Sequence, residues 1–129
     1  MKKLTDHRKA EEELAKFALT LPETTAGLGW PPTRAMRVRN KMFCVFGDRG
    51  ETLDQFTMLV KLPIAAEMVQ ELWFVKESKG WFKQHDWVWA HFGPDDDVFE
   101  EIETLKAWIT QSYCAMAPKK LAKLLRGDP

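Results

Sequence analysis

The chain has 129 residues, a length that suits one domain and is too short for two. A hydrophobic content of 45% is enough to build one core without disulfides or metals, which excludes a disordered chain. Nineteen basic and nineteen acidic side chains give a net charge of zero, so overall charge cannot drive binding to nucleic acid or to an acidic membrane, and any anion site must be a local patch.

The chain opens with a predicted helix and a loop. Apolar side chains recur at helical spacing over residues 6–20, and Pro22 closes this helix. Residues 24–32 contain two glycines and a Pro-Pro pair, a composition that predicts an irregular connection. We expect Trp30 to anchor that loop.

Three strands are predicted next. Residues 34–46 alternate with a period of two on either side of Arg39-Asn40, which predicts two strands joined by a tight turn. Residues 56–61 are rich in β-forming side chains and predict a third strand.

The middle of the chain predicts a short helix and two further strands. Pro63 suits the first position of a helix, and we expect Trp73 at the end of that helix to be buried in the core. An extended segment is predicted to start at Trp81-Phe82, and residues 87–92 predict another strand.

A long helix closes the chain. Asp95, Asp96 and Asp97 suit the first turn of this helix because acidic groups complement the helix dipole there, and Trp108 is expected to be core. Pro118 ends it, and residues 119–125 predict a short basic helix. The predicted order is α-β-β-β-α-β-β-α, a single α+β domain over residues 1–129 with an antiparallel sheet.

Several classes of chemistry lack a signature in this chain. Cys44 and Cys114 lie seventy residues apart in apolar stretches and are expected to be reduced core thiols. The histidines show no zinc-ligand spacing, and no phosphate-binding glycine loop or nucleophile motif is present. We therefore expect no metal, no cofactor and no enzymatic activity. Because no long apolar segment occurs, we expect a cytoplasmic protein without a membrane partner.

Basic side chains concentrate in a few places despite the neutral total. Arg37 and Arg39 are predicted to share one strand face, with Lys41 just past the turn. The alternative is an ordinary solvated hairpin whose edge lysines guard against aggregation. The basic groups are Arg34, Arg37, Arg39 and Lys41; Lys61; Lys76, Lys79 and Lys83; and Lys119, Lys120, Lys123 and Arg126.

Aromatic rings and cations are interleaved in one short stretch. Trp81, Trp87 and Trp89 occur beside Lys79, Lys83 and His85. Cations neutralise phosphate, and rings stack on exposed bases for about 1–3 kcal/mol each, so the mixture suits nucleic acid. Core burial is the competing explanation, because Trp87 and Trp89 share a strand face, and Trp81 is the best candidate for an exposed ring.

Several short segments follow one another in a characteristic order. They are Trp30, Arg37-Val38-Arg39-Asn40-Lys41-Met42-Phe43, Leu59-Val60-Lys61-Leu62, Lys79-Gly80-Trp81, His85-Asp86-Trp87-Val88, Ser112-Tyr113 and Ala117-Pro118-Lys119-Lys120-Leu121. In this order and spacing the chain resembles the MmcQ/YjbR family of small bacterial proteins over residues 10–125. One departure is Pro31-Pro32-Thr33 after Trp30, where many members have Gly-His-Pro.

The resemblance implies a fold similar to the bacterial frataxin CyaY, a twisted antiparallel sheet covered on one face by the N- and C-terminal helices. It also implies a DNA-binding role for two β-hairpin wings, with Arg37, Arg39 and Lys41 on the first wing and Lys79, Trp81 and His85 on the second. The frataxin likeness raises iron binding, but the first helix carries mixed charges instead of an acidic ridge, so iron delivery is not expected.

The leading hypothesis is a non-enzymatic monomer that binds DNA mainly through phosphate contacts with little sequence selectivity. Its contact residues would be Arg37, Arg39, Lys41, Lys61, Lys79, Trp81, His85, Lys119 and Lys120.

Two other hypotheses remain open. The protein could be an adaptor for a protein or a small ligand, with Trp81 and Trp87 lining a groove on an aromatic-rich sheet face. An enzyme with its site between Arg37, His85 and Asp86 would need an unsignalled convergence of these residues.

Overall fold

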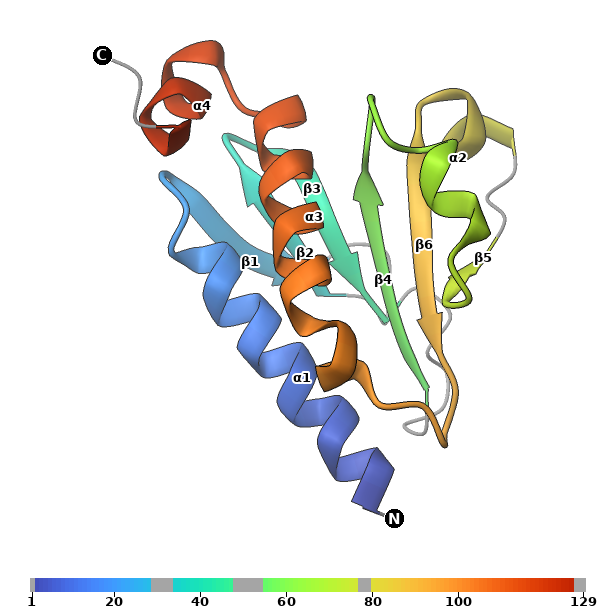
Figure 1. Cartoon of the computed structure of the whole chain (residues 1–129). Coiled ribbons are helices and arrows are strands. Elements are labelled where there is room, and N and C mark those ends of the chain that lie inside the picture. Colours follow the sequence, from blue (N-terminus) through green and yellow to red (C-terminus); the bar gives the residue numbers. More distant parts are fainter. Residues whose placement is uncertain (1, 29–33, 48–54, 77–79, 127–129) are drawn as a thin grey trace.

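An antiparallel sheet organises the computed structural model, which describes residues 2–28, 34–47, 55–76 and 80–126 (Figure 1). Within these ranges the sheet has six strands in the order β1-β2-β3-β4-β6-β5. Every pair of neighbouring strands is antiparallel. The strands are β1 (Thr24–Leu28), β2 (Arg34–Val38), β3 (Lys41–Phe46), β4 (Phe56–Lys61), β5 (Val75–Lys76) and β6 (Trp87–Phe92).

The two long helices cover one face of this sheet. Figure 1 shows α1 (Lys2–Leu19) and α3 (Ile102–Met116) lying side by side across it, with α4 (Lys119–Arg126) following α3. The short α2 (Gly80–Gln84) connects β5 to β6, and two 3-10 turns, η1 (Met68–Glu71) and η2 (Val98–Glu101), complete the elements of the described chain. The predicted α+β architecture, with N- and C-terminal helices on one face of an antiparallel sheet, is confirmed.

Both faces of the central strands are apolar. On β4, Phe56, Met58 and Val60 belong to the core under the helices, whereas Leu59 faces the opposite side. That second side, called here the outer face, carries a smaller buried cluster made of Ala35, Val45, Leu59, Trp87 and Trp89. Trp87 and Trp89 thus share a face as predicted, and both are buried.

The first hairpin turns at the two residues that the sequence indicated. Arg39 and Asn40 have φ of 47° and 71°, and Val38 is paired with Lys41 across them. Two central residues with positive φ are typical of the hairpin turn whose twist matches the flanking strands. Further along this hairpin, Met36 pairs with Cys44 and Arg37 with Met42, so β3 has one extra residue, Phe43, at a bulge.

A buried hydroxyl joins β3 to β4 where direct pairing stops. The last direct pair is Cys44 with Val60, and the next residues would be Phe43 and Lys61. Instead, the Lys61 amide donates to Ser112 Oγ at 2.8 Å, and the Ser112 hydroxyl donates to the Phe43 carbonyl at 2.5 Å. Ser112 on α3 is fully buried. Its side chain therefore substitutes for one bond of the ladder.

The prediction of an irregular segment over residues 24–32 is wrong for its first part. Thr24–Leu28 form β1, an edge strand paired with β2 from Thr24 opposite Val38 to Leu28 opposite Arg34. Pairing with β2 supplies the backbone hydrogen bonds, and this outweighs the weak strand preference of a segment containing glycine. Trp30 lies outside the described residues, so its anchoring role stays a prediction.

The predicted second helix and the extended start at Trp81 are also wrong. After Leu62 the chain runs through turns and η1 to the short β5, on the far side of β6 from β4, and Gly80–Gln84 are helical. Trp73 is 54% exposed because it lies in a turn, where its ring is nearly perpendicular to the Phe74 and Phe92 rings that it contacts. The prediction assumed a regular helix whose apolar face would bury Trp73, but the chain leaves η1 through a bend and a turn at residues 72–74.

The predicted final helices and the buried Trp108 are confirmed, but Asp95, Asp96 and Asp97 do not form the first turn of the long helix, because the 3-10 turn η2 comes first and α3 begins at Ile102. Asp97 accepts a hydrogen bond from the Phe99 amide at 3.0 Å and caps η2, which leads into α3. Trp108 is 5% exposed and belongs to the core. Cys44 and Cys114 are both free thiols, and burial raises the pKa of the Cys44 thiol well above its ordinary value. Within the described ranges, no helix combines the length and the apolar character needed to cross a membrane.

Candidate nucleic-acid interface

One end of the sheet gathers most of the predicted contact residues. The β2–β3 turn, the end of β4 and the start of β6 lie at this end, since Val38 is opposite Lys41 and Lys61 is opposite Trp87. Figure 1 shows α2 and α4 at the same end. We name the group Lys41, Lys61, Trp81, His85, Lys119 and Lys120 the contact edge.

The first hairpin contributes Lys41 to this edge, but Arg39 is already paired. Arg39 Nε lies 2.8 Å from Glu23 Oε1, and Arg39 Nη2 lies 3.0 Å from Glu23 Oε2. The guanidinium lowers the pKa of the Glu23 carboxyl mainly through this hydrogen bond, so the carboxylate stays charged and cancels much of the Arg39 charge. Both side chains are about half exposed.

Arg37 and Arg39 do not share a strand face, which corrects the prediction. β2 ends at Val38, and Arg39 adopts positive φ in the turn, so the period of two does not extend to it. Arg37 lies on the outer face, and its Nη1 would be 3.6 Å from a Cβ on Gly27. The Arg37 guanidinium therefore extends across β1, away from α2.

Lys61 sits at the end of β4, next to the aromatic residues. It follows Leu59 on the outer face and is the cross-strand partner of Trp87. Its side chain is half-buried, and its amide is the group held by Ser112. The sequence prediction did not include Ser112. The helical spacing could have identified it, because Ser112 falls on the same apolar face of α3 as Leu105, Trp108 and Ile109.

Trp81 on α2 is exposed, as predicted. Its side chain is 58% exposed, and its ring centroid lies 4.5 Å from that of His85 and 6.4 Å from that of the buried Trp87. The predicted second wing therefore ends in the short helix α2 and not in an extended hairpin, because residues 80–84 are helical. Lys79 falls outside the described residues.

The lysines of α4 extend the edge beyond the first hairpin. Lys119 and Lys120 are exposed at the start of α4, directly after Pro118. Pro118 lines a hollow together with Arg39 and Lys41, which places the start of α4 against the hairpin turn. The positive charge of Lys120 also helps to lower the pKa of Glu23.

An apolar cavity of about 270 Å³ opens within the contact edge. Trp81 and Trp87 form one side of it, as the groove hypothesis expected, and Lys41 lies at its border. The described residues that line it are Lys41, Met42, Val45, Leu59, Trp81, Trp87 and Met116.

The enzyme hypothesis gains no support from the arrangement of its residues. Arg37 is on β2, whereas His85 and Asp86 directly precede β6. Strands β3 and β4 lie between them, so the backbones are about 14 Å apart at the usual strand spacing. The structure does not bring Arg37 together with His85 and Asp86.

Acidic groups elsewhere serve structural roles. Asp96 accepts the Gly93 amide at 2.7 Å, and Asp97 caps η2. Across the described ranges, no group of three or more His, Cys, Asp or Glu side chains is arranged to hold a metal ion.

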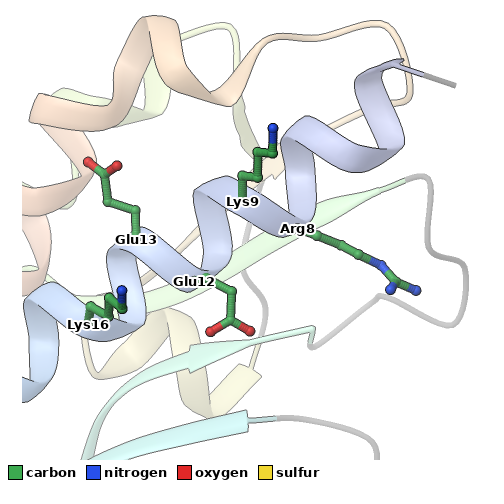
Figure 2. A pocket seen from close by; sticks show the side chains of 5 residues that line it. All are labelled: Arg8, Lys9, Glu12, Glu13 and Lys16. Carbon is green, nitrogen blue, oxygen red and sulfur yellow. The ribbon is translucent and has the colours of Figure 1, made fainter.

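A second hollow, on α1, has no converging chemistry. Figure 2 shows its side chains spreading around the helix instead of pointing to one centre. Its carboxylates are engaged elsewhere, Glu12 with Arg34 and Glu13 with Lys106. The lining residues are Arg8, Lys9, Glu12, Glu13 and Lys16.

Comparison with known proteins identifies a family. A family model described as YjbR matches residues 19–115, about three quarters of the chain. This match covers the whole sheet and nearly all of α3. No curated protein matches the sequence.

Proposed function

Because the chain belongs to the YjbR family, we propose that it binds DNA through the contact edge and catalyses no reaction. The observation that carries this proposal is the grouping of exposed Lys41 and exposed Trp81 around one cavity, with Lys119 and Lys120 on the neighbouring helix. Lysines neutralise phosphates, and an indole ring on the surface can stack on a base. In this proposal the protein acts as a cytoplasmic monomer.

The contact edge offers mainly charge, so the binding is expected to be weakly selective. Contacts to phosphate fix the position of a protein on DNA but do not read its sequence. Arg39 contributes less than Lys41, since Glu23 already neutralises it. Trp81 adds a preference for unpaired bases, worth about 1–3 kcal/mol for one stacked base.

Fluorescence anisotropy with a mixed-sequence DNA duplex tests the proposal. We expect dissociation constants of about 1–100 µM that weaken steeply between about 50 and 200 mM salt. The double substitution Lys41→Gln with Lys119→Gln should weaken binding about tenfold and flatten the salt slope by nearly 2 units, about 0.9 for each lost phosphate contact. No binding in low salt at about 100 µM protein contradicts the proposal.

A matched control separates the contact edge from general charge. Arg8→Gln with Lys9→Gln removes two positive charges from exposed positions on α1. This pair should change affinity less than about twofold, and an equal loss in both double variants refutes the assignment of the edge. Glu23→Gln should strengthen binding, because it releases Arg39 and removes a repulsive carboxylate.

A second candidate function is the binding of a small ligand. The apolar cavity between Trp81, Trp87 and the start of β3 favours it, because ligand sites are concave and mostly apolar with few polar groups at the border.

A further inference from the structure

The cavity of the contact edge has walls that are nearly all apolar. Met42 and Val45 come from β3, Leu59 from β4, and Trp81 and Trp87 from α2 and β6. Among the described residues that line it, Lys41 is the one that carries a charge. A ligand for this site therefore needs an apolar body and has one charged group to satisfy.

The cavity is formed where β3 and β4 are held by a side chain. Beyond Cys44 and Val60, the two strands are joined through Ser112 instead of by a direct backbone bond. Met116, on the helix that packs against the other face, lines the same cavity as Leu59. The cavity is thus lined from both layers of the fold, by residues of the sheet and by one residue of α3.

The two indole rings give the cavity one fixed wall and one exposed wall. Trp87 is 5% exposed, whereas Trp81 is 58% exposed, and their planes are tilted by 30°. Covering Trp81 removes apolar surface from water, which stabilises a complex by about 25 cal/mol for each Å² buried. A flat aromatic ring makes the largest contact with such a wall.

The positive charge of Lys41 at the border of the cavity favours an anionic ligand. Lys41 is exposed at the border of the cavity, and no carboxylate of the described residues is within ion-pair distance of its ammonium. A cationic ligand would be repelled, and a neutral ligand would gain no ion pair with the ammonium. An inorganic anion would gain nothing from the apolar walls.

The volume of the cavity indicates how many rings the ligand can have. A dry cavity of roughly 150 Å³ is known to hold a single benzene ring. A space of about 270 Å³ is close to twice that volume, so it suits two fused rings with a short acidic group.

We propose that this cavity binds an aromatic monocarboxylate of about two fused rings, with the ring against Trp81 and Trp87 and the carboxylate at Lys41. The inference rests on the second candidate function, ligand binding, and does not depend on DNA binding.

Calorimetric titration with three probes tests the proposal. Naphthoate carries both ring and charge, naphthalenemethanol carries the ring alone, and acetate carries the charge alone. We expect a dissociation constant of about 0.1 mM for naphthoate, about tenfold weaker binding of naphthalenemethanol, and no measurable binding of acetate. In NMR spectra, naphthoate should shift the indole signals of Trp81 and Trp87.

Two variants locate the site and the charge. Lys41→Met should reduce naphthoate binding to the level of naphthalenemethanol, whereas Lys16→Met on α1 should leave both unchanged. Trp81→Ala should weaken both ring probes; because this side chain is largely exposed, the variant should fold normally.

The possible failures are distinguishable. Equal binding of naphthoate and naphthalenemethanol, unaffected by Lys41→Met, overturns the carboxylate class but keeps ligand binding. Binding that neither shifts the Trp81 signal nor responds to Trp81→Ala overturns the site. If no ring probe binds to protein with a native NMR spectrum, both the inference and the second candidate function fail.

Discussion

Replacing Ser112 with alanine leaves two buried backbone groups without a partner. The hydroxyl accepts from the Lys61 amide and donates to the Phe43 carbonyl, and the residue is fully buried. An unpaired buried polar group costs about 1–3 kcal/mol, so two groups with partial relaxation of β3 and β4 should cost about 3 kcal/mol. We expect Ser112→Ala to lower the free energy of unfolding by this amount.

The expected loss is large enough to measure by heat or urea. An unfolding entropy of about 2.1 cal/mol/K per residue gives about 0.27 kcal/mol/K for 129 residues, so Tm should fall by about 11 °C. Urea unfolding followed by tryptophan fluorescence should give the same loss in free energy. The Lys61 amide should also exchange its hydrogen faster in the variant, because its acceptor is gone.

Thr110→Ala is the matched control on the same helix. Its hydroxyl donates to the Lys106 carbonyl at 3.1 Å, within α3 and partly exposed. Its loss should shift Tm by less than about 2 °C, because no buried group is left unpaired. A Ser112→Ala loss below about 1 kcal/mol, with unchanged exchange at Lys61, would refute the bridging role of the hydroxyl.

Three further predictions follow from burial. In urea unfolding, Trp108→Ala should lower the free energy of unfolding by about 3–5 kcal/mol, and Trp73→Ala by only about 1–2 kcal/mol, because Trp73 is half exposed. Equal losses in the two variants would contradict the exposure of Trp73. Burial raises the pKa of the Tyr113 phenol in the folded protein. As the pH rises, this phenol therefore ionises first in the unfolded chain, near pH 10. The contribution of Tyr113 to the free energy of unfolding is present below that pH and is lost as the pH rises through the higher pKa of the folded state. Tyr113→Phe should lose its hydrogen bond to the Pro22 carbonyl, worth about 1 kcal/mol at neutral pH, yet lose less stability than the wild type above pH 10 in urea titrations. Alkylation followed by mass spectrometry should label half-buried Cys114 in the native protein and Cys44 only after unfolding, and equal labelling of the two thiols would contradict the burial of Cys44.

Local patterns in the sequence determined much of the fold. The period of two predicted β2 and β3, and the Arg39-Asn40 dipeptide predicted their turn. The helical period predicted α3, although α3 begins at Ile102, after the 3-10 turn that Asp97 caps. These features depend on residues a few positions apart, which share either a strand face, a helix face or a turn.

Features that depend on strand order had no local signal. β1 is a strand because β2 lies beside it, and Trp73 is exposed because it lies in the turn that leads into the edge strand β5. The same holds for charge: the sequence predicted Arg39 as a DNA-contact residue, and only the fold shows that Glu23 pairs with it.

Sequence patterns were enough to indicate the family resemblance, the antiparallel architecture and the exposure of the Trp81 ring. Which groups meet at the contact edge depends instead on how the distant segments pack in three dimensions. Ser112 reaches Phe43 across 69 positions, and Lys41 lines one cavity with both Trp81 and Met116. Periodicity reports which side chains face a core, whereas the register between distant strands and helices decides which of them become neighbours.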